Sequence, residues 1–171
     1  MTTSSEGSSQ YLSFKLGNEL FAIKVGNVRE VLEFIKITSV PGEPDFLKGI
    51  INVRGSVIPV MNLHSILEIP ESVRDVNSRI IVTEIPLPEE TIVLGIIADS
   101  VKEVLDIDEN EIEDPPKVAK KYDSELTKGI VTRANHFIII LDIESVVSKG
   151  NAMTEIHNLE NDTDDEVIEA V

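Results

Sequence analysis

LFAIKVGNVREVLE, residues 20–33, aligns without a gap on VLGIIADSVKEVLD, residues 93–106. A second pair follows in the same order, since residues 48–51 (KGII) match 128–131 (KGIV) and residues 57–63 match 137–143. Matched polar residues inside these blocks argue against a chance alignment of β-branched residues. The chain therefore carries one supersecondary unit twice. Two copies are too few for a solenoid, and the duplication indicates two small barrels or sheets packed together.

Short β-branched runs separated by turn signals predict an all-β fold. Gly17-Asn18 and Arg54-Gly55 mark two hairpins, and residues 86–90 mark a longer one. Each unit offers about five strands, which suits a small closed barrel with only brief helical turns. In detail, the pattern predicts a short helix at residues 28–32, a strand at residues 35–40, and a helical turn at residues 45–48.

Composition divides the chain into three parts. Residues 1–10 are small and polar and predict a disordered leader. Residues 11–148 form the β region, with approximate subdomains at 11–70 and 78–148 on either side of a polar connector. The sequence leaves open whether strands are exchanged between these subdomains. Residues 149–171 are acidic and predict a tail that is disordered or weakly helical.

The charge balance narrows the class of partner. A net charge of −16 over 171 residues disfavours binding to nucleic acid or to an anionic membrane surface. The chain has no cysteine, no apolar run of membrane-spanning length and no signal-peptide pattern at its start. These features predict a cytoplasmic protein without direct membrane contact.

A search for catalytic chemistry finds no recognisable site. The three histidines are scattered, and no phosphate-binding glycine loop is present. Residues 106–110 resemble the start of a calcium loop, but Glu111 replaces the required glycine and Lys117 replaces the bidentate glutamate. We therefore expect no metal, no cofactor and no enzymatic activity. A hydrolase using two carboxylates stays open, and two buried acids facing each other would favour it.

Two repeat-related segments, residues 28–31 and 101–104, place valines beside charged residues. Such a mixture suits an interface with a polar rim. It suits equally well a barrel filled by valines with its charges in water. Arg54, on a hairpin, is either a solvated turn residue or an anchor for partner carboxylates.

Residues 46–63, FLKGIINVRGSVIPVMNL, resemble the signature of the CheW family of bacterial chemotaxis coupling proteins. Residues 21–31 and 95–104 match the same family, and the resemblance covers about residues 11–148. The chain departs from the family pattern at three positions. Val53 replaces a leucine, and Asn62 and His64 replace the aspartate and arginine that flank the leucine at position 63.

The resemblance implies a pair of five-stranded SH3-like barrels. It also implies a non-enzymatic adaptor that links the cytoplasmic tip of chemoreceptors to the regulatory domain of the histidine kinase CheA, within membrane receptor arrays. Carried over by position, the partner-binding residues are Val28, Glu30, Arg54 and Val101. Three glycines are expected to be structural instead, allowing tight turns or close backbone approach: Gly49, Gly55 and Gly95.

An alternative keeps the fold and changes its context, because the regulatory domain of the kinase and the adaptor part of receiver-fused proteins resemble the same family. The chain carries no histidine-kinase core and no receiver phosphoacceptor pattern. This favours a stand-alone adaptor.

Overall fold

The computed structural model describes residues 7–42, 45–114 and 125–148. The first repeat contains β1 (Ser8–Leu16), β2 (Glu19–Lys24), the 3₁₀ turn η1 (Val25–Asn27), β3 (Val28–Glu33), β4 (Leu47–Val53), β5 (Ser56–Met61) and α1 (Leu63–Ile66). The second contains β6 (Arg79–Pro86), β7 (Thr91–Ala98), β8 (Ser100–Asp108), η2 (Glu109–Glu111), β9 (Thr127–Arg133), β10 (His136–Leu141) and α2 (Ile143–Ser148).

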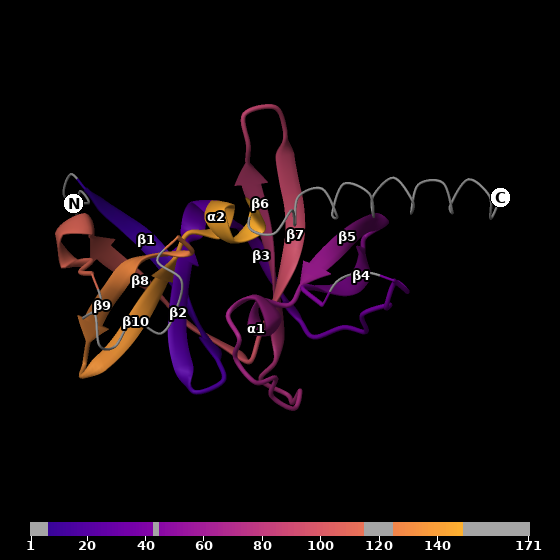
Figure 1. Cartoon of the computed structure of the whole chain (residues 1–171), viewed down its shortest axis with the longest axis horizontal. Coiled ribbons are helices and arrows are strands. Elements are labelled where there is room, and N and C mark those ends of the chain that lie inside the picture. The colour runs from indigo at the N-terminus through magenta and orange to yellow at the C-terminus, as the bar shows by residue number, and fades with distance from the viewer. Residues whose placement is uncertain (1–6, 43–44, 115–124, 149–171) are drawn as a thin grey trace.

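These strands form two five-stranded sheets, which confirms the all-β prediction. Strands β8-β1-β2-β10-β9 form the first sheet, here called barrel A, and strands β3-β6-β7-β5-β4 form the second, barrel B. Barrel A lies at the left of Figure 1 and barrel B at the right, with α1 and α2 between them. Under the repeat alignment the two strand orders correspond position by position, including one parallel pair in each sheet, β2 with β10 and β7 with β5.

The sheets do not follow the predicted boundary between residues 11–70 and 78–148. Each barrel takes two neighbouring strands from one repeat and three from the other, so β1–β2 and β6–β7 are exchanged. The chain passes between barrels through η1 in the first repeat and through the single residue Asp99 in the second. The structural units therefore combine both halves of the chain.

Four local predictions also need correction. Strand β1 begins at Ser8, so residues 8–10 do not belong to a disordered leader, and residues 1–6 lie outside the described residues, as does the tail at 149–171. Residues 28–32 are in strand β3, where exposed and half-buried side chains alternate along an edge strand. Residues 35–40 form only an isolated bridge at Thr38, and β4 begins at Leu47 in place of a helical turn.

Each sheet closes by the same backbone device. The chain beyond β3 returns to β4, where Thr38 and Ile50 exchange two hydrogen bonds of 2.9 Å. The chain beyond β8 returns to β9, where Glu113 and Ile130 do the same at 2.9 and 2.8 Å. Because both edges of each sheet meet in this way, each sheet is a small barrel.

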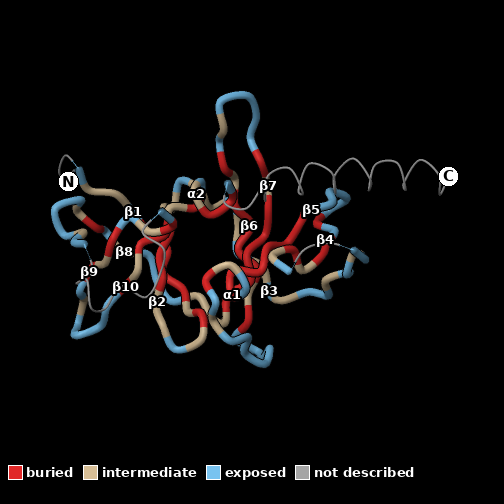
Figure 2. Tube along the Cα trace, in the orientation of Figure 1, coloured by how far each residue is buried: buried red, intermediate tan, exposed pale blue. Residues whose placement is uncertain are grey.

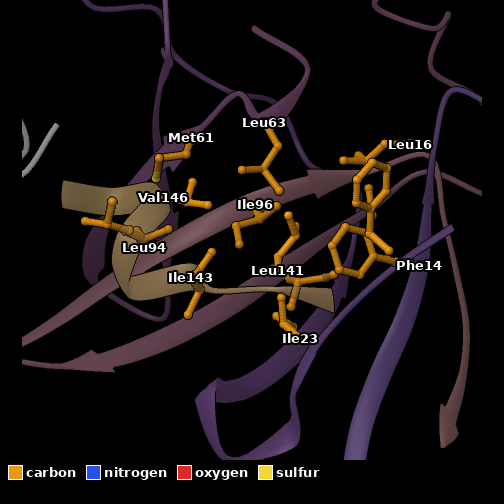
Figure 3. Close-up of a cluster of buried hydrophobic side chains, with 14 of the residues drawn as sticks. Phe14, Leu16, Ile23, Met61, Leu63, Leu94, Ile96, Leu141, Ile143 and Val146 are labelled. Atoms are coloured by element: carbon orange, nitrogen blue, oxygen red, sulfur yellow. The ribbon is translucent and has the colours of Figure 1, made fainter. Parts of the chain in front are cut away.

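The apolar side chains form three clusters. One cluster fills barrel B around Val60 and Val82, and another fills barrel A around Ala22 and Ile140. The largest, here called the central core, joins the two barrels and includes Phe14, Phe21, Leu94, Ile96, Leu141 and Val146. Figure 3 shows Leu141, Ile143 and Val146 of the second repeat meeting Met61 and Leu63 of the first. In Figure 2 the buried segments gather along the middle strands, and the hairpin tips are exposed.

Candidate docking surface

An ion pair between Glu30 and Arg54 marks the outer edge of barrel B. Glu30 lies on β3, and Arg54 lies in the two-residue turn between β4 and β5. Arg54 and Gly55 both have positive φ angles, +49° and +88°, as primed hairpin turns require. The Gly55 amide donates to Asn52 Oδ1 at 3.0 Å, which holds the turn. The guanidinium is therefore presented on a rigid support.

The charge on this edge is oriented but still accessible. The Arg54 side chain remains 71% exposed, while that of Glu30 is 26% exposed. The hydrogen bond from Arg54 holds the pKa of Glu30 below its usual value, so the carboxylate is ionised at neutral pH. Arg29 on the same strand pairs with Glu84 at 3.2 Å. An arginine fixed by one carboxylate retains donors that a second carboxylate, on a partner, can accept.

Val28 and Val101 occupy equivalent places in the two repeats. Both are half-buried and pack against the central core, on the edge strands β3 and β8 respectively. Each is followed by a β-bulge, at Arg29 in β3 and at Lys102–Glu103 in β8. Val28, Glu30 and Arg54 thus all belong to barrel B, where Glu30 contacts Arg54 and Val28 packs against the central core, and Val101 belongs to barrel A.

The three predicted glycines meet different local demands. Gly49 has φ +147°, and a Cβ there would lie 2.0 Å from the Thr38 carbonyl oxygen, so only glycine allows the bridge that closes barrel B. Gly55 has φ +88° in the hairpin turn. At Gly95 a Cβ would lie 3.0 Å from Ile80 Cγ2, so the constraint there is side-chain packing.

Exposed apolar residues occur in two repeat-related pairs, of which the first lies in the segments 28–31 and 101–104 already considered and the second was missed by sequence reasoning. Val31 on β3 and Val104 on β8 are exposed, and they align with each other in the two repeats. Val57 at the start of β5 is 37% exposed, and its counterpart Phe137 on β10 is 65% exposed. The internal alignment supplied this signal, because an apolar position that recurs outside both cores has a reason other than packing.

The two departures from the family pattern beside Leu63 lie inside the molecule. Asn62 and His64 are both buried. The Asn62 amide donates to Glu71 at 2.6 Å, and His64 Nε2 lies 3.4 Å from Asp99 Oδ2. Each replacement therefore has an acidic partner within this chain, and neither lies on the docking surface.

The described residues offer no chemistry that supports the hydrolase alternative. No aspartate or glutamate among them is buried, and they contain no group of three metal-ligating side chains. None of the helices in the described ranges is long and apolar enough to cross a membrane.

Two fused barrels with exposed, repeat-related apolar positions and a fixed exposed arginine define a β-sheet scaffold of the kind that binds other proteins. The family model for the CheW-like domain matches residues 10–150, and the chain belongs to this family. A chemotaxis protein CheW from Thermotoga maritima is 34% identical over 140 residues, covering 82% of this chain and 88% of the relative. One from Treponema pallidum is 29% identical over 139 residues, covering 81% and 82%.

A solved structure gives the same result. The crystal structure of the scaffolding protein TtCheW from Thermoanaerobacter tengcongensis superposes with a TM-score of 0.73 at 35% identity, covering 84% of this chain and 90% of that one. The predicted membership of the CheW family is confirmed. Proteins of this family are scaffold or adaptor proteins and not enzymes, and this chain is a chemotaxis adaptor.

Proposed function

We propose that this chain couples chemoreceptors to the histidine kinase CheA, and that it works in the cytoplasm at membrane receptor arrays through protein contacts. The match of the CheW-like model to residues 10–150 carries this proposal. The chain would contact the regulatory domain of the kinase and the cytoplasmic tip of the receptor. Two barrels with related but different outer faces suit a protein that binds two partners at once.

Barrel B supplies the polar part of the proposed interface. Arg54 is exposed and held by Glu30, so its remaining donors point outward from a rigid turn. Val28 contributes half-buried apolar surface on the same edge strand, and the exposed Val31 extends it. Such an arrangement gives an apolar centre and a charged rim. On barrel A, Val101 and Val104 contribute the corresponding apolar contact.

The test is reconstitution of kinase control from purified components. The chain, the kinase and a receptor fragment are mixed, and kinase activity is measured with and without the receptor. We expect kinase activity to become receptor-controlled only when this chain is present. A kinase that ignores the receptor in the presence of the folded chain would overturn the proposal.

Charge reversal at Arg54 tests the interface itself. We expect Arg54→Glu to weaken kinase binding at least tenfold, because a fixed cation at an interface rim becomes a repelling anion. The double variant Glu30→Arg with Arg54→Glu restores the internal pair with opposite polarity. If the double variant regains binding, Arg54 acts only through its pair with Glu30. If binding stays lost in a folded protein, Arg54 contacts the partner.

Arg133→Glu is the matched control in barrel A. Arg133 Nη2 pairs with Glu111 Oε2 at 2.8 Å, as Arg54 pairs with Glu30 in barrel B. Reversing the charge there breaks a second arginine–glutamate pair of the molecule without touching the proposed contact. Equal loss of kinase binding in both variants would show a general charge effect and remove the specific role of Arg54.

A further inference from the structure

One carboxylate lies at the junction of the two barrels. Asp99 is the single residue between β7 of barrel B and β8 of barrel A. Its Oδ2 accepts hydrogen bonds from the Gly17 amide at 2.6 Å and from Ser72 Oγ at 3.0 Å, and lies 3.4 Å from His64 Nε2. Gly17 belongs to a hairpin turn of barrel A, whereas His64 and Ser72 belong to α1 and to the loop that follows it. These four residues are called the Asp99 node below.

Backbone hydrogen bonds, burial and close packing restrain the residues of the Asp99 node. The Asp99 amide donates to the Lys15 carbonyl at 2.9 Å, so the backbone is tied to barrel A as well. The side chain of His64 is 4% exposed and that of Asp99 is 20% exposed. A Cβ on Gly17 would lie 3.1 Å from Ile69 Cγ2, and the Ile69 amide donates to the His64 carbonyl at 2.8 Å. The hairpin turn of barrel A thus abuts the segment that carries His64.

The repeat-related crossover lacks any such node. Gly26 aligns with Asp99, and no heavy atom lies within 4 Å of a Cβ placed on it. Glu144, which aligns with His64, is exposed. Since the fold makes the same crossover twice and needs the carboxylate only once, the node is a specialised feature of one side of the molecule.

The apolar contacts of the central core and the hydrogen bonds of the Asp99 node constrain the two barrels in different ways. Apolar burial in the central core stabilises the contact between the barrels. Because apolar burial is non-directional, it tolerates small rotations of one barrel against the other. Hydrogen bonds to a carboxylate are directional, and those made to a charged group are stronger than neutral ones. Three donors converging on one oxygen from both barrels fix an angle that the core alone does not.

We propose that Asp99, acting through His64, Ser72 and the Gly17 amide, is a positioning residue that sets the angle between the two barrels. It thereby fixes Val101 on barrel A relative to Val28, Glu30 and Arg54 on barrel B. The placement of these partner-binding residues rests on the proposed function, whereas the role of Asp99 in setting the angle does not. The affinity of a partner that contacts both barrels would then depend on the angle, and the affinity of a partner that contacts one barrel would not.

The angle can be measured directly, because the chain contains no cysteine. Ser56→Cys and His136→Cys introduce two exposed labelling sites at equivalent hairpin positions, one in each barrel. Pulsed electron paramagnetic resonance then gives the distribution of distances between the two spin labels. We expect a narrow distribution in the parent and a broadened or shifted one in Asp99→Ala. An unchanged distribution in folded Asp99→Ala would overturn the proposal.

Asp75→Ala is the control variant. Among the described residues, its carboxylate accepts only from the Asn77 amide at 2.8 Å, within one exposed turn, so the distribution should stay narrow. If Asp99→Ala does not fold, His64→Ala and Ser72→Ala each remove one donor and should broaden the distribution less. His64→Arg keeps a donor to the carboxylate and should retain the narrow form. Broadening by Asp75→Ala equal to that by Asp99→Ala would contradict the role assigned to the node.

Affinity measurements distinguish a failure of the role of Asp99 from a failure of the proposed adaptor function. We expect folded Asp99→Ala to lose roughly tenfold in affinity for the assembled kinase and receptor fragment, about the effect of one hydrogen bond to a charged group. A broadened distance distribution with unchanged ternary affinity would refute the link from angle to docking and leave the adaptor proposal intact. A parent protein that binds neither partner would refute the adaptor proposal, while the distance measurement would still decide the role of Asp99.

Discussion

Barrels A and B share the backbone devices that close them. Gly49 and Gly129 align in the repeat, have φ angles of +147° and +143°, and each faces the carbonyl of the bridge residue that closes its barrel, Thr38 or Glu113. The hairpin turns Arg54-Gly55 and Ala134-Asn135 have positive φ at every residue. What recurs in both copies is therefore the geometry that lets a five-stranded sheet curl onto itself.

The side chains on the outside of the barrels differ. Barrel B presents Arg54 at its hairpin tip, where barrel A has Ala134, and Phe137 replaces Val57 on the neighbouring strand. One crossover carries Asp99 and the other carries Gly26. The comparison teaches that backbone geometry fixes the residues that close a barrel, whereas residues on the outside are open to a separate docking chemistry on each copy.

Adding a Cβ at the closing glycines should have the largest effect. We expect Gly49→Ala to lose roughly 3 kcal/mol or more of unfolding free energy, because the Cβ would lie 2.0 Å from the Thr38 oxygen at a φ that disfavours alanine. Gly129→Ala should cost less, since its nearest carbonyl oxygen is 2.6 Å away. Urea unfolding measures both.

Gly26→Ala is the control, since nothing lies within 4 Å of its Cβ and its φ is not positive. Its stability should stay within about 1 kcal/mol of the parent. Equal losses at Gly49 and Gly26 would mean that the bridge does not close the barrel.

The β-bulges in the edge strands β3 and β8 have different local support, and removal of a single hydroxyl tests this difference. In barrel A the buried Ser13 hydroxyl donates to the Glu103 carbonyl at 2.9 Å and accepts from the Glu103 amide at 3.1 Å. In barrel B, Val82 takes the place of Ser13 and is the register partner of Glu30 between strands β6 and β3, so it offers no hydroxyl to the bulge. We expect Ser13→Ala to cost about 1–3 kcal/mol, because it leaves two backbone groups without a partner.

Ser56→Ala, at an exposed hairpin position, should be near neutral by the same unfolding measurement. A neutral Ser13→Ala would show that the bulge in barrel A holds without its hydroxyl, as the one in barrel B does.

Acid titration of the Glu30–Arg54 and Glu111–Arg133 ion pairs should give the smallest effect on stability. The pKa of Glu30 is lowered by Arg54, and that of Glu111 is lowered first by the Asp108 amide and then by Arg133. A lowered pKa in the folded state gives stability that is present above the unfolded pKa and is lost as pH falls through the folded pKa. Both pairs are exposed, so the loss is small and screened by salt.

The barrels should differ in this titration as well. Arg133 also donates to the Asp106 carbonyl at 2.6 Å, a contact that survives protonation of Glu111. Glu30→Gln should therefore lower the melting temperature at pH 7 more than Glu111→Gln, and both differences should vanish well below pH 4. A difference that persists in acid would show that the glutamines perturb packing and not charge.

Much of the fold was predictable because its signals are local. The turn signals and β-branched runs predicted the β1–β2, β4–β5 and β6–β7 hairpins, and the duplication predicted two similar sheets. Residues 28–32 were wrongly predicted as a helix, since their charged residues lie between valines on an edge strand with a bulge. A bulge breaks the alternation on which strand prediction depends.

The candidate surface was predictable in part. Val28, Glu30, Arg54 and Val101 are carried over from the family resemblance, and their role in partner binding stays a prediction. Only the tertiary structure places Glu30 against Arg54, because the pair joins an edge strand to a hairpin 24 residues further along the chain.

The sequence by itself determined the duplication, the strand-rich class and the hairpin turns, because these depend on neighbouring residues and on a repeated pattern. Only the tertiary structure decided that β1–β2 and β6–β7 change places. The exchanged strands are repeat-related, so either assignment buries similar faces and the local pattern does not distinguish them. A crossover of one residue at Asp99 leaves no room for a hairpin turn, and the chain therefore continues from one barrel into the other.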